Sequence, residues 1–132
     1  MKARVAEVFD SVQGEGLYLG EKQIFVRFFD CNLRCTYCDT KLDRFMEYEP
    51  AELFEEIKLY RDKYHSISFT GGEPLLYGAF LKEILKLTSG CGHRLNRLTR
   101  DCITQSNSSC ICVERRPISG YKLQCTEKKT SI

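Results

Sequence analysis

The sequence has no long apolar run, no secretory signal pattern and almost no net charge. Its 132 residues include 20 Lys and Arg against 18 Asp and Glu, which leaves a formal net charge of +2. A membrane-spanning helix needs about 20 consecutive apolar residues, so we expect no membrane association. The absence of a signal pattern predicts a cytoplasmic protein, and the small net charge gives no reason to expect nucleic acid as a partner.

Histidine is also scarce, with 2 residues, whereas cysteine is abundant, with 8. Many cysteines without a signal indicate a reducing compartment and metal or redox chemistry rather than a disulfide framework. Three of them, Cys31, Cys35 and Cys38, have the spacing C-x3-C-x2-C directly after the apolar residues 24–29. That apolar run predicts a buried strand, so the three thiols follow its carboxyl end, where ligands gather in α/β proteins.

Closely spaced thiolates are typical ligands of both iron–sulfur clusters and structural zinc. Structural zinc usually takes four protein ligands. Here the nearest histidine is His65, and no cysteine lies between Cys38 and Cys91. From spacing alone, an iron–sulfur cluster, a zinc site and a chance arrangement all remain open.

The composition changes sharply near Leu87. Residues 1–87 contain 12 Lys and Arg against 15 Asp and Glu and every phenylalanine, whereas residues 88–132 contain 8 against 3 and five of the cysteines. We therefore predict a core segment over 1–87 and a non-matching, irregular tail over 88–132. A shifted reading frame or a premature end would produce this change. Residues 92–100 would make only a poor strand, because they carry much charge and few β-branched or aromatic residues.

The hydrophobic pattern of residues 1–87 predicts strands and helices in alternation. Strands are expected over residues 2–9, 23–29 and 66–69. One helix should begin at Glu49 and Pro50, and another should follow the third strand; their apolar stripes are Leu53, Phe54, Ile57, Tyr60 and Tyr64, and Phe80, Leu81, Ile84, Leu85 and Leu87. This order predicts an α/β fold with parallel strands.

Two glycine-rich segments interrupt these elements. Residues 13–16, Gln-Gly-Glu-Gly, follow the first strand, and residues 70–74, Thr-Gly-Gly-Glu-Pro, follow the third. Glycine lets a ligand approach the backbone closely, although each segment alone could be an ordinary turn. The second segment should leave the sheet at the same edge as the cysteines.

Arg27 is a charge within an apolar strand. An unpaired buried guanidinium is costly, so it needs an anionic partner. Glu7 and Asp10 are candidates within the chain. The alternative is the carboxylate of a substrate, which arginine can hold with two parallel hydrogen bonds.

Taken together, these motifs resemble those of the radical S-adenosylmethionine (SAM) superfamily. The three cysteines with aromatic Tyr37, followed by Gly71-Gly72-Glu73, carry the resemblance to the superfamily. Residues 11–16, residues 25–27 and Asp39-Thr40 narrow it to the 7-carboxy-7-deazaguanine synthase family. The resemblance covers residues 1–87 and implies a partial, truncated radical-SAM βα barrel, since an intact member has more βα units than this chain can hold.

The resemblance also implies the cofactors and their ligands. Cys31, Cys35 and Cys38 would hold a [4Fe–4S] cluster whose open iron binds SAM. Residues that would line the SAM site are Tyr37, Cys38, Asp39 and Gly72. Thr40 would offer its hydroxyl to Mg²⁺, which prefers oxygen ligands; a loop-capping role for that hydroxyl remains the alternative.

The substrate implied by the resemblance is 6-carboxy-5,6,7,8-tetrahydropterin, converted to 7-carboxy-7-deazaguanine with loss of ammonia in queuosine and 7-deazapurine biosynthesis. Arg27 would hold its carboxylate, and the ring would be positioned by Val12, Gln13, Gly14 and Thr70. An electron donor such as flavodoxin would serve the cluster, and a full-length protein could form a homodimer. We expect weak or no activity from these 132 residues alone.

Two other functions remain open. One is a radical SAM activase that installs a glycyl radical on a partner protein. The other is a non-enzymatic metal-binding remnant. The Gln-Gly-Glu-Gly segment, Arg27 and Asp39-Thr40 favour the synthase over the activase.

Overall fold

The computed structural model describes residues 1–14, 18–34, 36, 38, 41–60, 64–90, 95–100 and 111–115, with side chains described as far as Thr88. The elements, in chain order, are β1 (Ala3–Val12), β2 (Lys22–Phe28), β3 (Met46–Tyr48), α1 (Pro50–Lys58), β4 (Ser66–Gly71), the 3₁₀ helix η2 (Pro74–Tyr77), α2 (Gly78–Gly90), β5 (Leu95–Arg100) and β6 (Ile111–Arg115).

The strands form one sheet in the order β3-β1-β2-β4-β6-β5. β2 and β4 are parallel, as the sequence predicts, and they are joined by a segment that contains β3 and α1. The other four pairings of the described strands are antiparallel. β1 and β2 make a hairpin closed by two hydrogen bonds, from Gln13 N to Glu21 O and from Gly20 N to Gln13 O.

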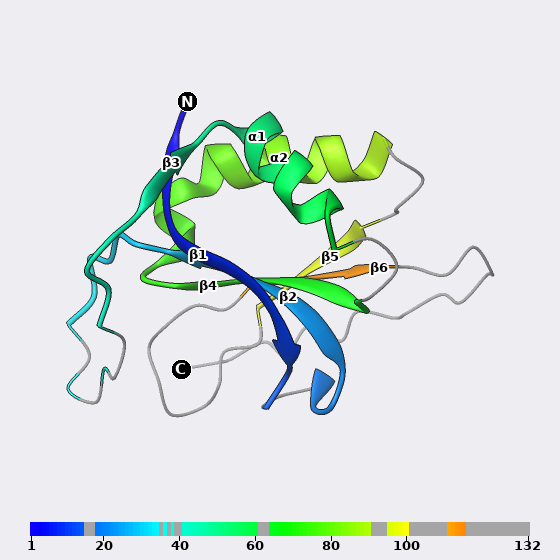
Figure 1. Cartoon of the computed structure of the whole chain (residues 1–132), viewed down its shortest axis with the longest axis horizontal. Helices are drawn as coiled ribbons and strands as arrows, with labels where there is room; N and C mark the ends of the chain where they lie inside the picture. The colour runs from blue at the N-terminus through cyan, green and yellow to red at the C-terminus, as the bar shows by residue number, and fades with distance from the viewer. Residues whose placement is uncertain are drawn as a thin grey trace, which may run out of the picture.

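Both α-helices lie on the same side of the sheet (Figure 1). The core is the apolar layer between them and the strands. Its buried members alternate along β2 and β4, as expected when one face of a strand packs against helices. They are Ala3, Val5, Ile24, Val26, Phe28, Ile67 and Phe69 from the sheet and Leu53, Phe54, Ile57, Phe80, Leu81 and Ile84 from the helices.

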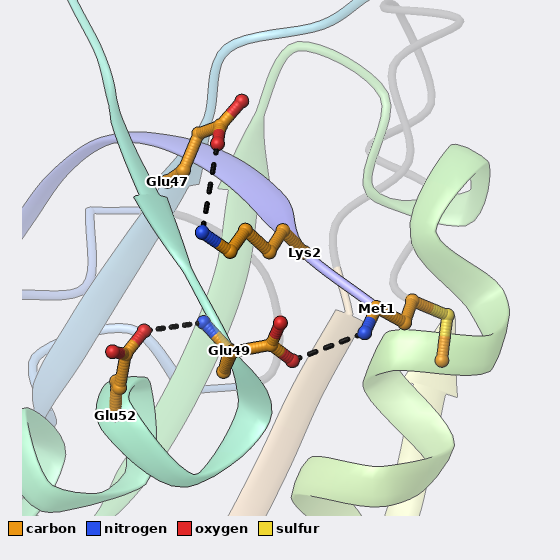
Figure 2. A network of polar contacts seen from close by, with 5 residues as sticks. All are labelled: Met1, Lys2, Glu47, Glu49 and Glu52. Atoms are coloured by element: carbon orange, nitrogen blue, oxygen red, sulfur yellow. Dashed lines mark hydrogen bonds and ion pairs between the residues drawn. The ribbon is translucent and has the colours of Figure 1, made fainter.

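The amino terminus is held against the start of α1 (Figure 2). The Met1 ammonium group lies 3.0 Å from Glu49 Oε2, and Lys2 Nζ lies 3.9 Å from Glu47 Oε2. Glu49 precedes α1, and its backbone N–H donates to Glu52 Oε2 at 2.7 Å. Proline at the first helical position needs no N–H partner there, so the sequence fixes the helix start at Pro50.

Most predicted elements are present, with shifted ends. The first strand runs further than predicted, to Val12, and the third continues to Gly71. α1 ends at Lys58, so Tyr60 and Tyr64 lie beyond it, although both still pack against the core.

The region after residue 87 contains two strands that the sequence pattern did not predict well. β5 lies within the stretch described above as a poor strand, and β6 pairs with β4. Most other residues of 88–132 lie outside the described residues, so the division of the chain at residue 87 stays a prediction. Within the part of the chain that the structure describes, no helix is long and apolar enough to cross a membrane.

Candidate cofactor and substrate site

The ends of the two parallel strands bring the predicted motifs together. Phe28 of β2 is in register with Gly71 of β4. Cys31 follows Phe28 by three residues, and Gly72 and Glu73 follow directly after β4. The prediction that the cysteine segment (residues 29–38) and the glycine segment (residues 70–74) leave the sheet at the same edge, formed by the carboxyl ends of β2 and β4, is therefore confirmed.

The two segments are joined by backbone hydrogen bonds. Gly72 N donates to Phe28 O at 2.8 Å, and Glu73 N donates to Asp30 O at 2.7 Å. A Cβ atom on Gly72 would overlap the Asp30 carbonyl group. Glycine is therefore required at position 72 by the close approach of the cysteine segment.

Gly71 is required for a different reason. Its φ is +91°, a conformation that side chains disfavour. A Cβ atom there would also collide with Cγ of Arg27 and lie 2.6 Å from Phe28 O. The absence of a side chain at Gly71 thus leaves space for the side chain of Arg27.

The cysteine segment is only partly described. Cys31 and Cys38 are exposed, and neither forms a disulfide. Leu33 N donates to Cys31 Sγ at 3.4 Å. The remaining predicted cofactor residues, Cys35, Tyr37, Asp39 and Thr40, lie outside the described residues. Among the described residues, no group of three metal-ligating side chains is assembled.

Asp30 anchors the start of this segment. Its carboxylate lies 2.9 Å from Arg4 Nη2 and accepts a hydrogen bond from the Tyr77 hydroxyl. Arg4 N donates to the same hydroxyl at 3.3 Å, and the Tyr77 ring stacks on Phe28 at 4.9 Å. Burial and then the Asp30 carboxylate raise the pKa of Tyr77 above its usual value. The group of Arg4, Asp30 and Tyr77, here the anchor network, joins β1, η2 and the cysteine segment.

Arg27 and Thr70 are adjacent on β2 and β4. They are paired in register, and they lie on the face of the sheet opposite the core, since Val26 and Phe69 point to the helices. Arg27 Nη1 lies 2.5 Å from Glu7 Oε1, and its side chain is 34% exposed. Glu7, one of the two carboxylates considered from the sequence, is therefore the anionic partner of Arg27 in this structure.

Residues 12–14 lie at the end of β1, where the hairpin turns. Val12 is exposed. Gln13 Nε2 donates to Gln23 Oε1 at 3.0 Å, and Gly14 has open space on its Cβ side. Residues 15 and 16 of the Gln-Gly-Glu-Gly segment lie outside the described residues, and residues 12–14 lie at the opposite end of β2 from the cysteines.

Sequence reasoning missed three residues of this region. Asp30 carried one signal, its position directly before Cys31. Gln23 is a polar residue in an apolar strand. It shares one face of β2 with Phe25 and Arg27, and the two polar residues could have marked that face as different from the core face. Tyr77 carried no local signal, because its partner Asp30 is 47 residues away.

The described residues fit a thiolate-bound cluster. Cys31 and Cys38 are both exposed, and Cys31, which follows β2 at this edge of the sheet, accepts a hydrogen bond at its sulfur from the backbone N–H of Leu33. Hydrogen bonds to cluster sulfurs are a usual feature of such sites. The glycine segment packs directly against this edge.

A comparison with protein families agrees with these motifs. The profile described as the radical SAM superfamily matches residues 26–101, which include the end of β2, the cysteine segment, β4 and α2. The chain belongs to the radical SAM superfamily.

Several curated relatives of this chain are named 7-carboxy-7-deazaguanine synthase. A 7-carboxy-7-deazaguanine synthase from Methanothermobacter thermautotrophicus is 50% identical over an alignment of 93 residues, and the match covers 65% of this chain and 37% of the relative. One from Archaeoglobus fulgidus is 38% identical over an alignment of 96 residues, and the match covers 65% of this chain and 43% of the relative. The chain thus spans less than half the length of these radical SAM relatives.

A solved structure supports the fold. The crystal structure of QueE from Escherichia coli superposes with a TM-score of 0.61 and 23% identity, covering 67% of this chain and 48% of that one. The partial radical SAM fold predicted from the sequence is thereby confirmed.

Proposed function

We propose that this chain carries the cofactor-binding and part of the substrate-binding machinery of a 7-carboxy-7-deazaguanine synthase. The reaction would convert 6-carboxy-5,6,7,8-tetrahydropterin to 7-carboxy-7-deazaguanine and ammonia. The observation that carries the proposal is the junction of the two parallel strands, where Gly72 and Glu73 donate to the carbonyls of Phe28 and Asp30 beside Arg27. The identity to relatives of that name, up to 50%, supports the choice of reaction.

Cys31, Cys35 and Cys38 would hold a [4Fe–4S] cluster with one iron open to SAM. When bound, the reduced cluster and SAM supply a radical that removes a hydrogen atom from the substrate. Residues assigned to SAM are Tyr37, Cys38, Asp39 and Gly72. We assign Thr40 to Mg²⁺, and we expect a separate electron donor such as flavodoxin and a cytoplasmic location.

Arg27 would hold the substrate carboxylate on the face of the sheet opposite the helices. Its guanidinium already pairs with a carboxylate, that of Glu7, and lies over the Phe9 ring at 5.4 Å. A substrate carboxylate would replace Glu7 or share the five N–H donors of the guanidinium with it. Thr70 lies directly beside Arg27 in the sheet, and residues 12–14 lie further along the same hairpin.

The test is anaerobic reconstitution of the chain with iron and sulfide, followed by incubation with the pterin, SAM, Mg²⁺ and a reductant. We expect bound iron and sulfide and at most weak formation of 7-carboxy-7-deazaguanine, because the chain spans less than half the length of its relatives. Cys35→Ala should lose both the cluster and the product, whereas the matched control Cys91→Ala, outside the motif, should retain bound iron and sulfide.

Three results would overturn the proposal. Iron and sulfide retained in full by Cys35→Ala would remove the cluster assignment. Zinc bound without sulfide would favour a metal-binding remnant. Deoxyadenosine released only in the presence of a protein substrate would favour a glycyl-radical activase.

A further inference from the structure

The side chain of Gln23 is buried on the face of the sheet opposite the helices. Its exposed fraction is 0%, although it is polar, and its neighbour Ile24 belongs to the core on the other face. Its Nε2 atom has no hydrogen-bond partner among the described residues. A buried donor without a partner costs about 1–3 kcal/mol, so such a group in a folded protein calls for an explanation.

The oxygen of the same amide is already engaged. Gln13 Nε2 donates to Gln23 Oε1 at 3.0 Å, which satisfies the buried oxygen and leaves the nitrogen of the same amide to be accounted for. Among the described residues, no hydrogen bond is made to Gln13 Oε1. Within the described part of the chain, the pair is therefore left with one unused donor, Gln23 Nε2–H, and one unused acceptor, Gln13 Oε1.

An aromatic surface connects this amide pair to Arg27. Gln23, Phe25 and Arg27 are alternate residues of β2 and lie on one face. Phe9 of β1 is opposite Phe25, with the ring centroids 5.3 Å apart, and the Arg27 guanidinium leans over Phe9. At about 3.3 Å per residue, roughly 13 Å separates the Cα atoms at the two ends of this row.

We propose that Gln23, oriented by Gln13, is a specificity-determining residue that reads the 4-oxo edge of a carboxylated pterin. This rests on the proposed function, which places the pterin carboxylate at Arg27. The ring would lie over the Phe9 and Phe25 side chains. Gln23 Nε2–H donates to the 4-oxo oxygen, and Gln13 Oε1 accepts from the neighbouring N3–H.

The consequence is discrimination against a 4-amino ring. In a 2,4-diaminopteridine, the oxygen is replaced by an amino donor, and N3 loses its hydrogen. Both contacts are then mismatched, and buried polar groups left unpaired reject such analogues strongly. We expect the wild-type chain to bind 6-carboxypterin at least about tenfold more tightly than 2,4-diaminopteridine-6-carboxylic acid, a difference of about 1.4 kcal/mol.

Binding of these two stable, fluorescent compounds to the full chain tests the proposal by fluorescence titration. Gln23→Leu should bind both with equal affinity, and Gln23→Met should behave in the same way if the leucine variant fails to fold. Ser11→Ala is the matched control, because Ser11 lies directly opposite Gln23 in β1 and is exposed. It should keep the wild-type preference.

Arg27→Ala separates this inference from the proposed function. It should weaken binding of both compounds and leave their ratio unchanged. Equal wild-type affinities that still depend on Arg27, or a preference retained by Gln23→Leu, would overturn the role of Gln23 and leave the proposed function standing. In that case Gln23 Nε2 donates its hydrogen bond to a buried water molecule. No binding of either compound by the wild-type chain would overturn both.

Discussion

At the scale of single residues, the tightest steric restriction in the site is at Gly72, where there is no room for a side chain. The Asp30 carbonyl lies where a side chain would begin, so the two motif segments can approach only if residue 72 has none. The same packing carries the hydrogen bonds from Gly72 N and Glu73 N. The Gly-Gly pair therefore has a structural role at this strand end that does not depend on any ligand.

Gly72→Ala should destabilise the chain by about 1–3 kcal/mol, because the added methyl group forces the cysteine segment away from β4. Gly78→Ala is the matched control, since nothing lies within 4 Å of its Cβ position at the start of α2. Alanine there should be neutral or slightly stabilising. The free energy of unfolding from urea denaturation measures both, and equal values for the two variants would contradict this account.

Residue roles that depend on local sequence were predictable, and those that depend on distant contacts were not. The cysteine spacing, the Gly-Gly pair and the isolated charge of Arg27 are visible within a few positions. The anchor network is not, because Arg4, Asp30 and Tyr77 meet only after the sheet has formed. A role for Gln23 could not be predicted either, because it depends on the burial of its side chain and on its contact with Gln13.

At the scale of elements, Tyr48 connects the edge strand β3 to α1. Its hydroxyl donates to Glu56 Oε2 at 2.5 Å. Burial, followed by the Glu56 carboxylate, raises the pKa of Tyr48 to about 12. The fold therefore favours the neutral phenol. This contribution to stability is fully present below pH 10, the usual pKa of tyrosine, and is lost as the pH rises toward 12.

We expect the wild-type free energy of unfolding to fall between pH 10 and about 12. The free energy of unfolding of Tyr48→Phe should fall less over this range. At neutral pH the variant should be less stable than the wild type by about 1 kcal/mol, because it lacks the hydrogen bond to Glu56. Glu56→Gln should give an intermediate pH dependence, because burial remains. Urea denaturation across the alkaline range measures this, and identical slopes for wild type and Tyr48→Phe would refute the assignment.

The elements with a clear hydrophobic period were predicted well. β2, α1 and α2 each have buried residues at the spacing that the sequence shows. The length of α1 was overestimated, because Tyr60 and Tyr64 continue the apolar stripe past the helix end at Lys58. β5 was expected only as a poor strand and β6 was not foreseen, because their antiparallel pairing with each other and of β6 with β4 depends on tertiary context.

At the scale of the whole molecule, Phe28 is the residue that joins the sheet to the helical layer below the site. It is fully buried, and its ring lies near those of Phe69 at 6.2 Å, Tyr77 at 4.9 Å and Phe80 at 6.3 Å. These rings come from β4, η2 and α2. The core therefore continues directly beneath the junction of the two motif segments.

Phe28→Ala should lower the free energy of unfolding by about 3–5 kcal/mol, because it removes a buried ring and leaves a cavity. Phe45→Ala is the matched control: Phe45 is 41% exposed, so the change should cost about 1 kcal/mol or less. Chemical denaturation measures both. A loss for Phe28→Ala no larger than that of the control would show that the core does not depend on this ring.

The hydrogen bonds of Gly72 and Glu73 to the segment before Cys31 also have a thermodynamic consequence. The segment that carries the three cysteines and the segment that carries Gly72 share two backbone hydrogen bonds, so a ligand that orders either segment reduces the entropy that the other must lose on binding. Such linkage is reciprocal: the factor by which a cluster tightens SAM binding equals the factor by which SAM tightens retention of the cluster. In this arrangement, SAM would protect the cluster from loss as well as react with it.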